Sequence, residues 1–218
     1  MTPTIKVDLL NQADLLSAFE KIKILLGQGG VIAFPTDTFY GLGANPFNER
    51  AVADIFKIKK RSPQKPILTL INSIKQLDQL ACDISPDAEK LIQNLWPGPL
   101  TLIFKALPHL PRNLTSGTGK IGVRLPDHEF SRQLIQYIDH PLTASSANLS
   151  GHPNSRTAEE VGRMDWNINL IVDGGKTAGG TESMVLDTTF APPKLVREGS
   201  ISKMQIESIL NMELTRAE

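Results

Sequence analysis

The sequence predicts an α/β fold built on an open sheet, and three observations lead to this prediction. Short apolar runs alternate with segments of helical periodicity along the 218 residues. Two of these runs, at residues 31–34 and 67–71, each meet a cluster of glycines, hydroxyls or cations at one end. The chain is also long enough to bury a sizeable core. We therefore expect one domain, or one domain with a small annex, and a small-molecule site where strands end.

In the first half of the chain, the expected elements alternate between strands and helices. Capping residues indicate where helices start, and apolar residues three or four positions apart indicate their buried faces. The expected strands are at residues 5–9, 31–34, 67–71 and 100–105. The expected helices begin after Asn11, Asn48 and Ser85. The second of them should bury Ile58 and end at a basic cluster, and the third should end at Trp96, which we expect in the core.

The second half of the chain continues this alternation. The expected strands are at residues 120–125, 168–172, 184–188 and 194–197, and a short run at residues 141–144 leads into residues 145–151. Helices are expected at residues 128–138, after Thr157 and after Ser202, and Thr157 forms a capping-box pattern with Glu160. Residues 107–119 connect two strands and are rich in Pro, Gly, Ser and Thr, so this connector is a candidate to fold over a ligand.

Composition excludes several classes of protein. The 23 Lys and Arg residues balance the 23 Asp and Glu residues, so no overall positive field would hold DNA or an anionic membrane. Cys82 is the single cysteine, which excludes an internal disulfide and favours a reducing compartment. No run of eighteen apolar residues and no signal-peptide pattern is present. We therefore expect a soluble, cytoplasmic protein.

Familiar nucleotide and metal motifs are not matched. Gly174-Gly175-Lys176-Thr177 has the tail of a P-loop, but Leu170 stands where the leading glycine should be. Gly41-x-Gly43 lacks the third glycine of a dinucleotide-binding fingerprint. The four histidines show no paired spacing and the lone cysteine cannot complete a set, so we expect no metal ligands from protein side chains.

A serine acyl-enzyme is one alternative from another class. Ser62-x-x-Lys65, Ser146-x-Asn148 and Lys176-Thr177-Ala178 occur in the order of the three motifs of penicillin-recognising enzymes, in which a lysine activates the serine. The third motif should end in glycine, and such short patterns arise often by chance. This alternative predicts covalent labelling of Ser62 by a β-lactam.

Several fixed cations and hydroxyls are expected at the ends of elements, where they could bind a triphosphate. Arginine offers a planar fork to phosphate and lysine a mobile point charge, so a mixed set suits charge that grows during phosphoryl or nucleotidyl transfer. The candidates are Lys59, Arg61, Arg124, Arg197, Ser146 and Asn148. The two cations at 59 and 61 could instead complement the dipole at a helix C-terminus.

These residues belong to a series of motifs that resembles the YrdC-like threonylcarbamoyl-AMP synthase family over about residues 15–200. The motifs are Pro35 to Gly43, Lys59-x-Arg61 with Lys65-Pro66, Trp96-Pro97-Gly98-Pro99-Leu100-Thr101, Val123-Arg124-Leu125-Pro126, residues 145–151 (SSANLSG), Asp173-Gly174-Gly175 and Glu182-Ser183. The resemblance implies the short form of the family, a single α/β domain over residues 1–218 in which flanking helices and a twisted, mixed and mostly open sheet surround a deep positive cavity. It also implies that threonine, bicarbonate and ATP become threonylcarbamoyl-AMP and pyrophosphate, which makes the chain a nucleotidyltransferase.

The resemblance implies a role for each matched residue. The expected catalytic residues, which would hold the ATP phosphates and the developing acyl-phosphate, are Lys59, Arg61, Ser146 and Asn148. The expected threonine-binding residues are Thr36, Arg124 and Ser183. Further nucleotide contacts are expected from Lys120, Asn154 and Arg197. Lys59 and Arg61 should be solvated cavity residues, so their replacement should slow the reaction with little loss of stability.

The implied reaction needs magnesium with ATP, held by phosphates and water, and no protein nucleophile. The activated group would then pass to adenosine 37 of tRNA through other proteins, so threonylcarbamoyl-transferase proteins and tRNA are the expected partners. Met184, Glu198 and Leu70 depart from the usual family pattern and could reshape the pocket. The main rival is an RNA-binding module without catalysis, suggested by the basic run at residues 57–61, although aromatic residues for base stacking are few.

Overall fold

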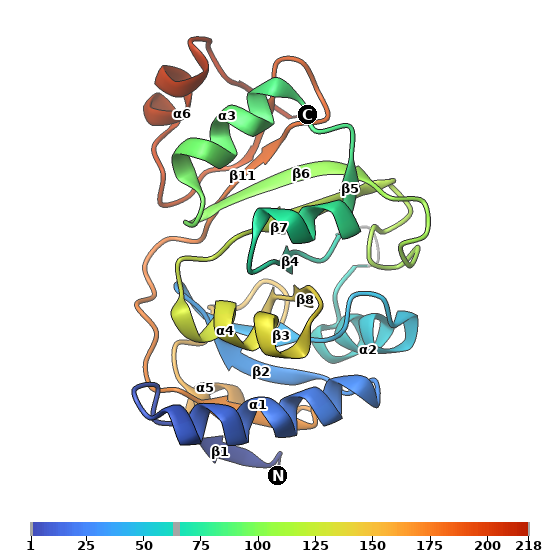
Figure 1. The fold of residues 1–218 in the computed structure, drawn as a ribbon, viewed down its shortest axis with the longest axis vertical. Helices are drawn as coiled ribbons and strands as arrows, with labels where there is room; N and C mark the ends of the chain where they lie inside the picture. Colours follow the sequence, from blue (N-terminus) through green and yellow to red (C-terminus); the bar gives the residue numbers. More distant parts are fainter. Residues whose placement is uncertain (1, 63–65, 218) are drawn as a thin grey trace.

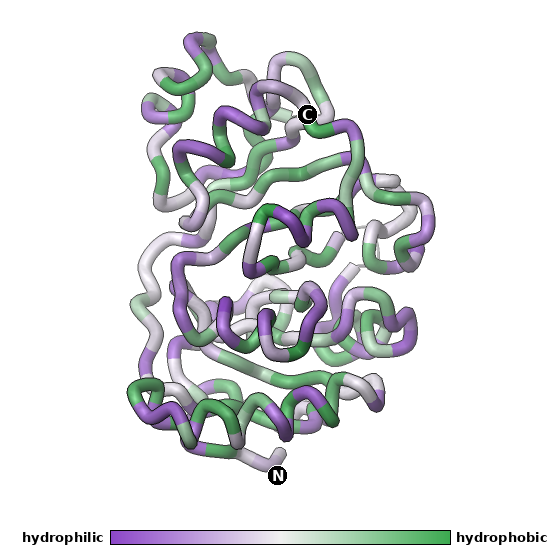
Figure 2. Tube along the Cα trace, viewed as in Figure 1, coloured by the Kyte–Doolittle hydropathy of each residue, from purple (hydrophilic) through white to green (hydrophobic). Residues whose placement is uncertain are grey.

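The computed structural model describes residues 2–62 and 66–217 and confirms the α/β class with flanking helices (Figure 1). The strands form two sheets, one of five and one of eight strands, in place of the one open sheet expected. Figure 2 shows that strands β2 and β6 are largely apolar, whereas apolar and polar residues alternate along the helices. Both sheets are therefore built around buried strands with amphipathic helices packed on them.

The five-stranded sheet has the order β1-β10-β2-β3-β9. Its strands are β1 (Thr4–Lys6), β10 (Leu170–Asp173), β2 (Ile32–Pro35), β3 (Tyr40–Gly43) and β9 (Ser145–Ser146). The first three are parallel, and β3 and β9 continue the sheet by antiparallel pairing. Strand β2 is buried on both faces: Ile32 and Phe34 belong to one apolar cluster and Ala33 to the other. This double burial explains why the strand is a continuous apolar run in the sequence.

Helices cover both faces of this sheet. Helices α1 (Gln12–Gly27) and α4 (Glu129–Ile138) pack against each other and contribute to the cluster that contains Phe34. Helices α2 (Glu49–Lys59) and α5 (Ala158–Gly162) contribute to the cluster that contains Ala33. The predicted N-caps Asn11, Asn48 and Thr157 are confirmed, because each side chain accepts a backbone N–H of the first turn.

The eight-stranded sheet runs β13-β12-β11-β6-β7-β4-β8, with β5 paired to β6. Its strands are β4 (Thr69–Leu70), β5 (Ala81–Cys82), β6 (Leu100–Ala106), β7 (Lys120–Arg124), β8 (Leu142–Thr143), β11 (Met184–Asp187), β12 (Lys194–Arg197) and β13 (Thr215–Arg216). The remaining helices are the short 3-10 helix η1 (Ile74–Gln79), α3 (Pro86–Leu95) and α6 (Lys203–Leu210). Helices α3 and α6 contact each other at one end of the molecule (Figure 1), and Trp96 is buried there, as expected for a core residue.

The two sheets meet at one short segment of chain. Strand β8 pairs with β4 of the larger sheet, and strand β9, which begins two residues later, pairs with β3 of the smaller sheet. Between them, the backbone N–H of Ala144 donates to the carbonyl of Leu68 at 2.8 Å. The Ser146–Asn148 loop therefore leaves the junction between the sheets, where groups from both can meet.

Candidate functional site

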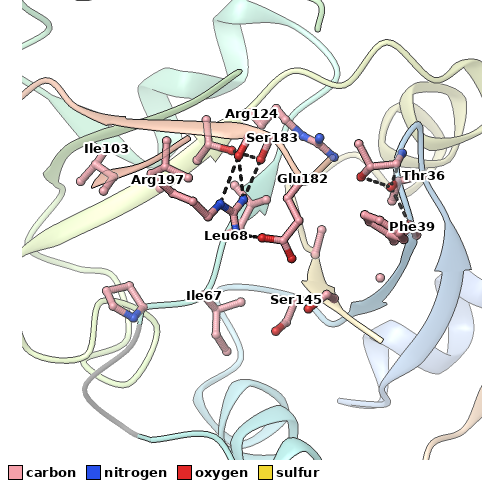
Figure 3. Close-up of a pocket in the computed structure, with 18 of the residues that line it drawn as sticks. Thr36, Phe39, Ile67, Leu68, Ile103, Arg124, Ser145, Glu182, Ser183 and Arg197 are labelled. Carbon is pink, nitrogen blue, oxygen red and sulfur yellow. Dashed lines mark hydrogen bonds and ion pairs between the residues drawn. The ribbon is translucent and has the colours of Figure 1, made fainter. Parts of the chain in front are cut away.

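A cavity of about 310 Å³ lies between the two sheets. Its lining comes from β3 and β9 of the smaller sheet, and from β6, β7, β11 and β12 of the larger one. Most of the predicted site residues line it, namely Thr36, Arg61, Lys120, Arg124, Ser146, Ser183 and Arg197. Figure 3 shows Arg124, Ser183, Glu182 and Arg197 gathered across from Thr36. Connector 107–119, a candidate to cover a ligand, contributes no residue to the lining; its Leu114 carbonyl accepts instead from Ile67.

Three predicted residues, Lys59, Asn148 and Asn154, do not line the cavity. Each of them contacts a residue that does. Lys59 is the last residue of α2, and its side chain is only 1% exposed, so the expectation of a solvated cavity residue is wrong for this lysine. The sequence pattern pointed to Ile58 as the buried residue of this turn, but Ile58 is half-buried. Lys59 lies four residues after Ile55 and thus on the same buried helix face.

The ammonium of Lys59 ties α2 to the loop after β9. Its Nζ donates to the Asn148 carbonyl at 2.8 Å, to Asn148 Oδ1 at 3.0 Å and, at short range, to the Ser146 carbonyl. The Ser146 hydroxyl donates to the same Asn148 Oδ1 at 2.7 Å. Lysine has three N–H donors, so these acceptors use all of them. The lysine thereby fixes the hydroxyl of Ser146 at the cavity wall.

Burial lowers the pKa of Lys59 to about 7, and the charge of Arg61 acts in the same direction, whereas Glu182 opposes it. Burial also lowers the pKa of Arg61, with the charge of Arg197 as the second cause. Arg61 lies on the cavity wall and donates from Nη2 to the carbonyl of Pro66 at 2.8 Å. Three positive groups thus lie close enough to disfavour one another's charge, which is the condition that an anionic ligand would relieve.

Arg124 is another cation of the cavity wall, and a buried ion pair holds it in place. Its side chain is 3% exposed, and Nη2 lies 3.0 Å from Oδ1 of Asp37. Burial lowers the pKa of Arg124, and the charge of Asp37 opposes this effect. The Nε of Arg124 is buried without a hydrogen-bond partner among the described residues. A carboxylate ligand in the cavity could satisfy part of this side chain's donor capacity.

Hydroxyl groups flank Arg124 on both sides of the cavity. Thr36 Oγ1 donates to the Phe39 carbonyl at 2.7 Å and lies 3.3 Å from Thr38 Oγ1. Ser183 Oγ lies 3.0 Å from Thr101 Oγ1 and accepts from Arg197 Nη2 at 3.1 Å. Both hydroxyls are fixed by the protein yet keep acceptor capacity. This arrangement can orient a small polar ligand between them.

Glu182 is a cavity residue that the sequence argument did not assign. Its Oε2 lies 2.5 Å from Arg197 Nη1, and its Oε1 accepts from Asn154 Nδ2 at 2.7 Å. Asn154 thus reaches the cavity through this carboxylate and does not line it. The signal was available in the sequence, because Glu182 directly precedes Ser183 in the last quoted motif.

The remaining cation of the cavity wall is Lys120, at the start of β7. Its Nζ is 2.8 Å from Asp187 Oδ2 and 4.3 Å from the ring centroid of Phe190. The three positions that depart from the family pattern contribute nothing to the lining: Leu70 and Met184 are fully buried in apolar clusters, and the exposed Glu198 pairs with Arg216.

The structure also bears on the two alternative functions, an RNA-binding module and a serine acyl-enzyme. The basic run at residues 57–61 does not form one surface, because Lys57 is exposed and paired with Asp54 while Lys59 is buried. A stacking surface for RNA gains no support from it. Lys65, which the acyl-enzyme alternative requires, lies outside the described residues. Within residues 2–62 and 66–217, no group of three or more His, Cys, Asp or Glu side chains could hold a metal ion, and no helix is long and apolar enough to cross a membrane.

Comparisons with known proteins agree with the geometry. A family profile for Sua5, YciO and YrdC proteins, described as "Telomere recombination", matches residues 24–199. A protein of Pyrococcus abyssi named threonylcarbamoyl-AMP synthase is 42% identical over 194 residues, which cover 87% of this chain and 57% of that protein. One of Bacillus subtilis with the same name is 42% identical over 188 residues, covering 85% and 54%. The chain thus spans little more than half the length of these curated relatives.

Solved structures show the same fold. The structure titled "Crystal structure of P. abyssi Sua5 complexed with L-threonine" superposes with a TM-score of 0.89 at 36% identity, covering 99% of this chain and 62% of that one. The crystal structure of E. coli YciO gives a TM-score of 0.79 at 27% identity, covering 93% and 97%. The arrangement of the two sheets around the cavity is therefore shared with these proteins.

Proposed function

Because the chain belongs to the Sua5, YciO and YrdC family, we propose that it is an L-threonylcarbamoyladenylate synthase, a nucleotidyltransferase that uses threonine, bicarbonate and ATP. One observation carries the proposal: a single cavity holds both an arginine suited to an amino-acid carboxylate and a cation group suited to phosphates. The L-threonine complex of the P. abyssi protein supports the choice of amino acid.

We assign the threonine to the end of the cavity near Arg124. The guanidinium of Arg124 is fixed by Asp37, so it can bind the carboxylate without reordering. The hydroxyls of Thr36 and Ser183 would contact the polar groups of the substrate. The triphosphate would lie toward Arg61, Arg197 and the Ser146 hydroxyl, with Lys120 and Asn154 as further nucleotide-side groups.

In the proposed reaction, the threonine amine bonds to the carbon of carbon dioxide derived from bicarbonate and loses a proton to solvent. A carboxylate oxygen of the resulting N-carboxythreonine then attacks the α-phosphorus of ATP. The bond from that phosphorus to the β-phosphate oxygen breaks, and pyrophosphate leaves with the electron pair. The protein supplies alignment and charge neutralisation, and alignment alone can contribute about 7 to 11 kcal/mol in well-oriented cases.

Magnesium bound to the triphosphate would neutralise part of its charge. Among the described residues, the cavity wall offers a single carboxylate, Glu182, so phosphates and water would supply most ligands of the ion, which prefers to keep its waters. The product would pass to tRNA position 37 through threonylcarbamoyl-transferase proteins, and we place this chemistry in the cytoplasm.

The test is mass spectrometry of the reaction mixture for threonylcarbamoyl-AMP, together with pyrophosphate release. Both signals should require threonine, bicarbonate and ATP together. Arg61→Ala should lower both by more than about tenfold, because a charge-assisted contact to phosphate is worth about 1.5–3 kcal/mol. A matched control, Lys57→Ala, removes an exposed cation from helix α2, which ends two residues before Arg61, and should react like the wild type. Pyrophosphate release without threonine, or none with all three substrates, would refute the proposal.

A further inference from the structure

Three cations of the cavity wall, Lys120, Arg124 and Arg197, are each paired with a carboxylate, but these carboxylates lie in different places. Asp37 pairs with Arg124, and Asp187 with Lys120, and neither of these two aspartates lines the cavity. Their side chains are 12% and 9% exposed. Glu182 lines the cavity itself, and its side chain is 38% exposed. An anion entering the cavity would therefore face the Glu182 carboxylate directly.

Glu182 contacts Arg197, the cation that an incoming anion would also bind. Arg197 donates from Nε and Nη2 to the Ser183 carbonyl, at 3.2 and 2.9 Å, so one side of the fork is fixed by the residue that directly precedes β11. Its Nη1 points to Glu182 at 2.5 Å. Figure 3 shows the carboxylate of Glu182 extending into the open part of the cavity beneath Arg197. Glu182 therefore occupies the free end of an otherwise anchored guanidinium.

From this geometry, and on the basis of the proposed function, we infer that Glu182 is an exchangeable counter-ion: it holds Arg197 and Asn154 in place in the empty cavity and yields Arg197 to a phosphate group of the nucleotide. Two anions cannot share one guanidinium edge without repulsion, so binding of the phosphate displaces the carboxylate. The exchange has a low cost, because both partners are more than a third exposed and such ion pairs contribute little. The buried partners Asp37 and Asp187 lack this freedom.

Glu182 is thus a positioning residue. It holds Arg197 and Asn154 in place in the empty cavity, and it competes with the nucleotide for Arg197. Glu182→Gln replaces the carboxylate by a neutral amide of similar shape. This side chain can still contact Asn154 but no longer competes as an anion for Arg197. The matched control is Glu198→Gln, which removes a carboxylate next to Arg197 in sequence that pairs with Arg216 outside the cavity. Glu182→Asp keeps the charge on a shorter stem and serves as the conservative variant.

The experiment measures binding of inorganic pyrophosphate without magnesium by isothermal titration calorimetry, and then the KM for ATP. We expect Glu182→Gln to bind pyrophosphate about two- to fivefold more tightly than the wild type, which is the range of an exposed ion pair. Glu198→Gln should bind like the wild type, and Glu182→Asp should lie between. The KM for ATP should fall in Glu182→Gln while the KM for threonine stays unchanged.

Equal or weaker pyrophosphate binding by Glu182→Gln would overturn the inference, because a carboxylate that competes with phosphate for Arg197 must weaken the binding of pyrophosphate. A gain in affinity shared by Glu198→Gln would overturn it as well, since the effect would then be one of general charge. The proposed function is judged separately: a wild-type protein that binds pyrophosphate but forms no threonylcarbamoyl-AMP would refute the reaction and leave the counter-ion result standing.

Discussion

The buried ammonium of Lys59 leads to a prediction that separates its structural contribution from its charge. Lys59→Met keeps the aliphatic stem but leaves three acceptors of the Ser146–Asn148 loop without their donor. Each buried acceptor left unsatisfied costs about 1–3 kcal/mol. Removal of a poorly solvated charge offsets part of this loss. We expect the free energy of unfolding to fall by about 2–3 kcal/mol near neutral pH.

The size of this loss should depend on pH, with a sign fixed by the direction of the pKa shift. The pKa of Lys59 is lowered to about 7 in the folded protein, whereas an unfolded lysine titrates near about 10.4. Between these values the unfolded chain binds one more proton than the folded chain. The free energy of unfolding of the wild type, relative to Lys59→Met, should therefore rise by up to about 1.4 kcal/mol per pH unit in this window.

The assay is urea denaturation of both proteins at several pH values from about 6.5 to 9.5, a range that brackets the folded-state titration. Subtracting the curves of Lys59→Met from those of the wild type cancels every other titrating group. Lys57→Met, an exposed lysine paired with Asp54, is the control and should change stability by less than about 1 kcal/mol throughout. A wild-type advantage that is constant over the range, or that shrinks as pH rises, would refute the reasoning about a buried and destabilised ammonium.

Three further predictions concern the walls of the cavity. Arg124→Met leaves Asp37 without its partner and should lower the free energy of unfolding by about 3–5 kcal/mol, as measured in a thermal or chemical melt. A loss of less than about 1 kcal/mol, which is typical of a surface ion pair, would show that the pair is not buried. Gly43→Ala would place a methyl group 2.8 Å from Cε1 of Phe34 and should destabilise by about 1–3 kcal/mol, as measured by urea midpoints. Ser146→Ala should weaken ATP binding by about tenfold in calorimetry with little change in melting temperature, and an equal fall of both would make the hydroxyl structural.

The sequence predicted those parts of the fold that depend on near neighbours. Helix starts at Asn11, Asn48 and Ser85 follow from side chains that cap a backbone N–H two or three residues away, so the whole signal lies within a few positions. Strand β5 was missed and β4 was predicted too long, because a two-residue strand owes its pairing to partners distant in the chain. The division into two sheets has the same origin, since it is decided at the switch from β8 to β9.

At the site, residue types were predictable and their exposure was not. Apolar spacing assigned Ile58 to the buried face of α2, yet the face runs through Ala51 and Ile55 to Lys59, and a lysine can be accepted there because three loop oxygens meet its ammonium. Those oxygens come from a loop some ninety positions later in the chain, as the separations of 87 and 89 residues show. No local pattern could have indicated them.

The balance of charge in the sequence likewise did not show where individual charges lie, and their positions in the structure suggest how the cavity works. Equal numbers of acidic and basic residues argued against an overall positive field, and the structure shows that the balance also holds locally, with a carboxylate beside Arg124, Lys120 and Arg197. Two of these carboxylates are buried and fixed, so they hold their cations whether or not a ligand is present. The third, Glu182, faces the cavity and is the exchangeable counter-ion that we infer. A phosphate that replaces it adds negative charge beside Lys59, whose protonation Glu182 already favours. Anion binding and a charged Lys59 should therefore reinforce each other, since each lowers the cost of the other.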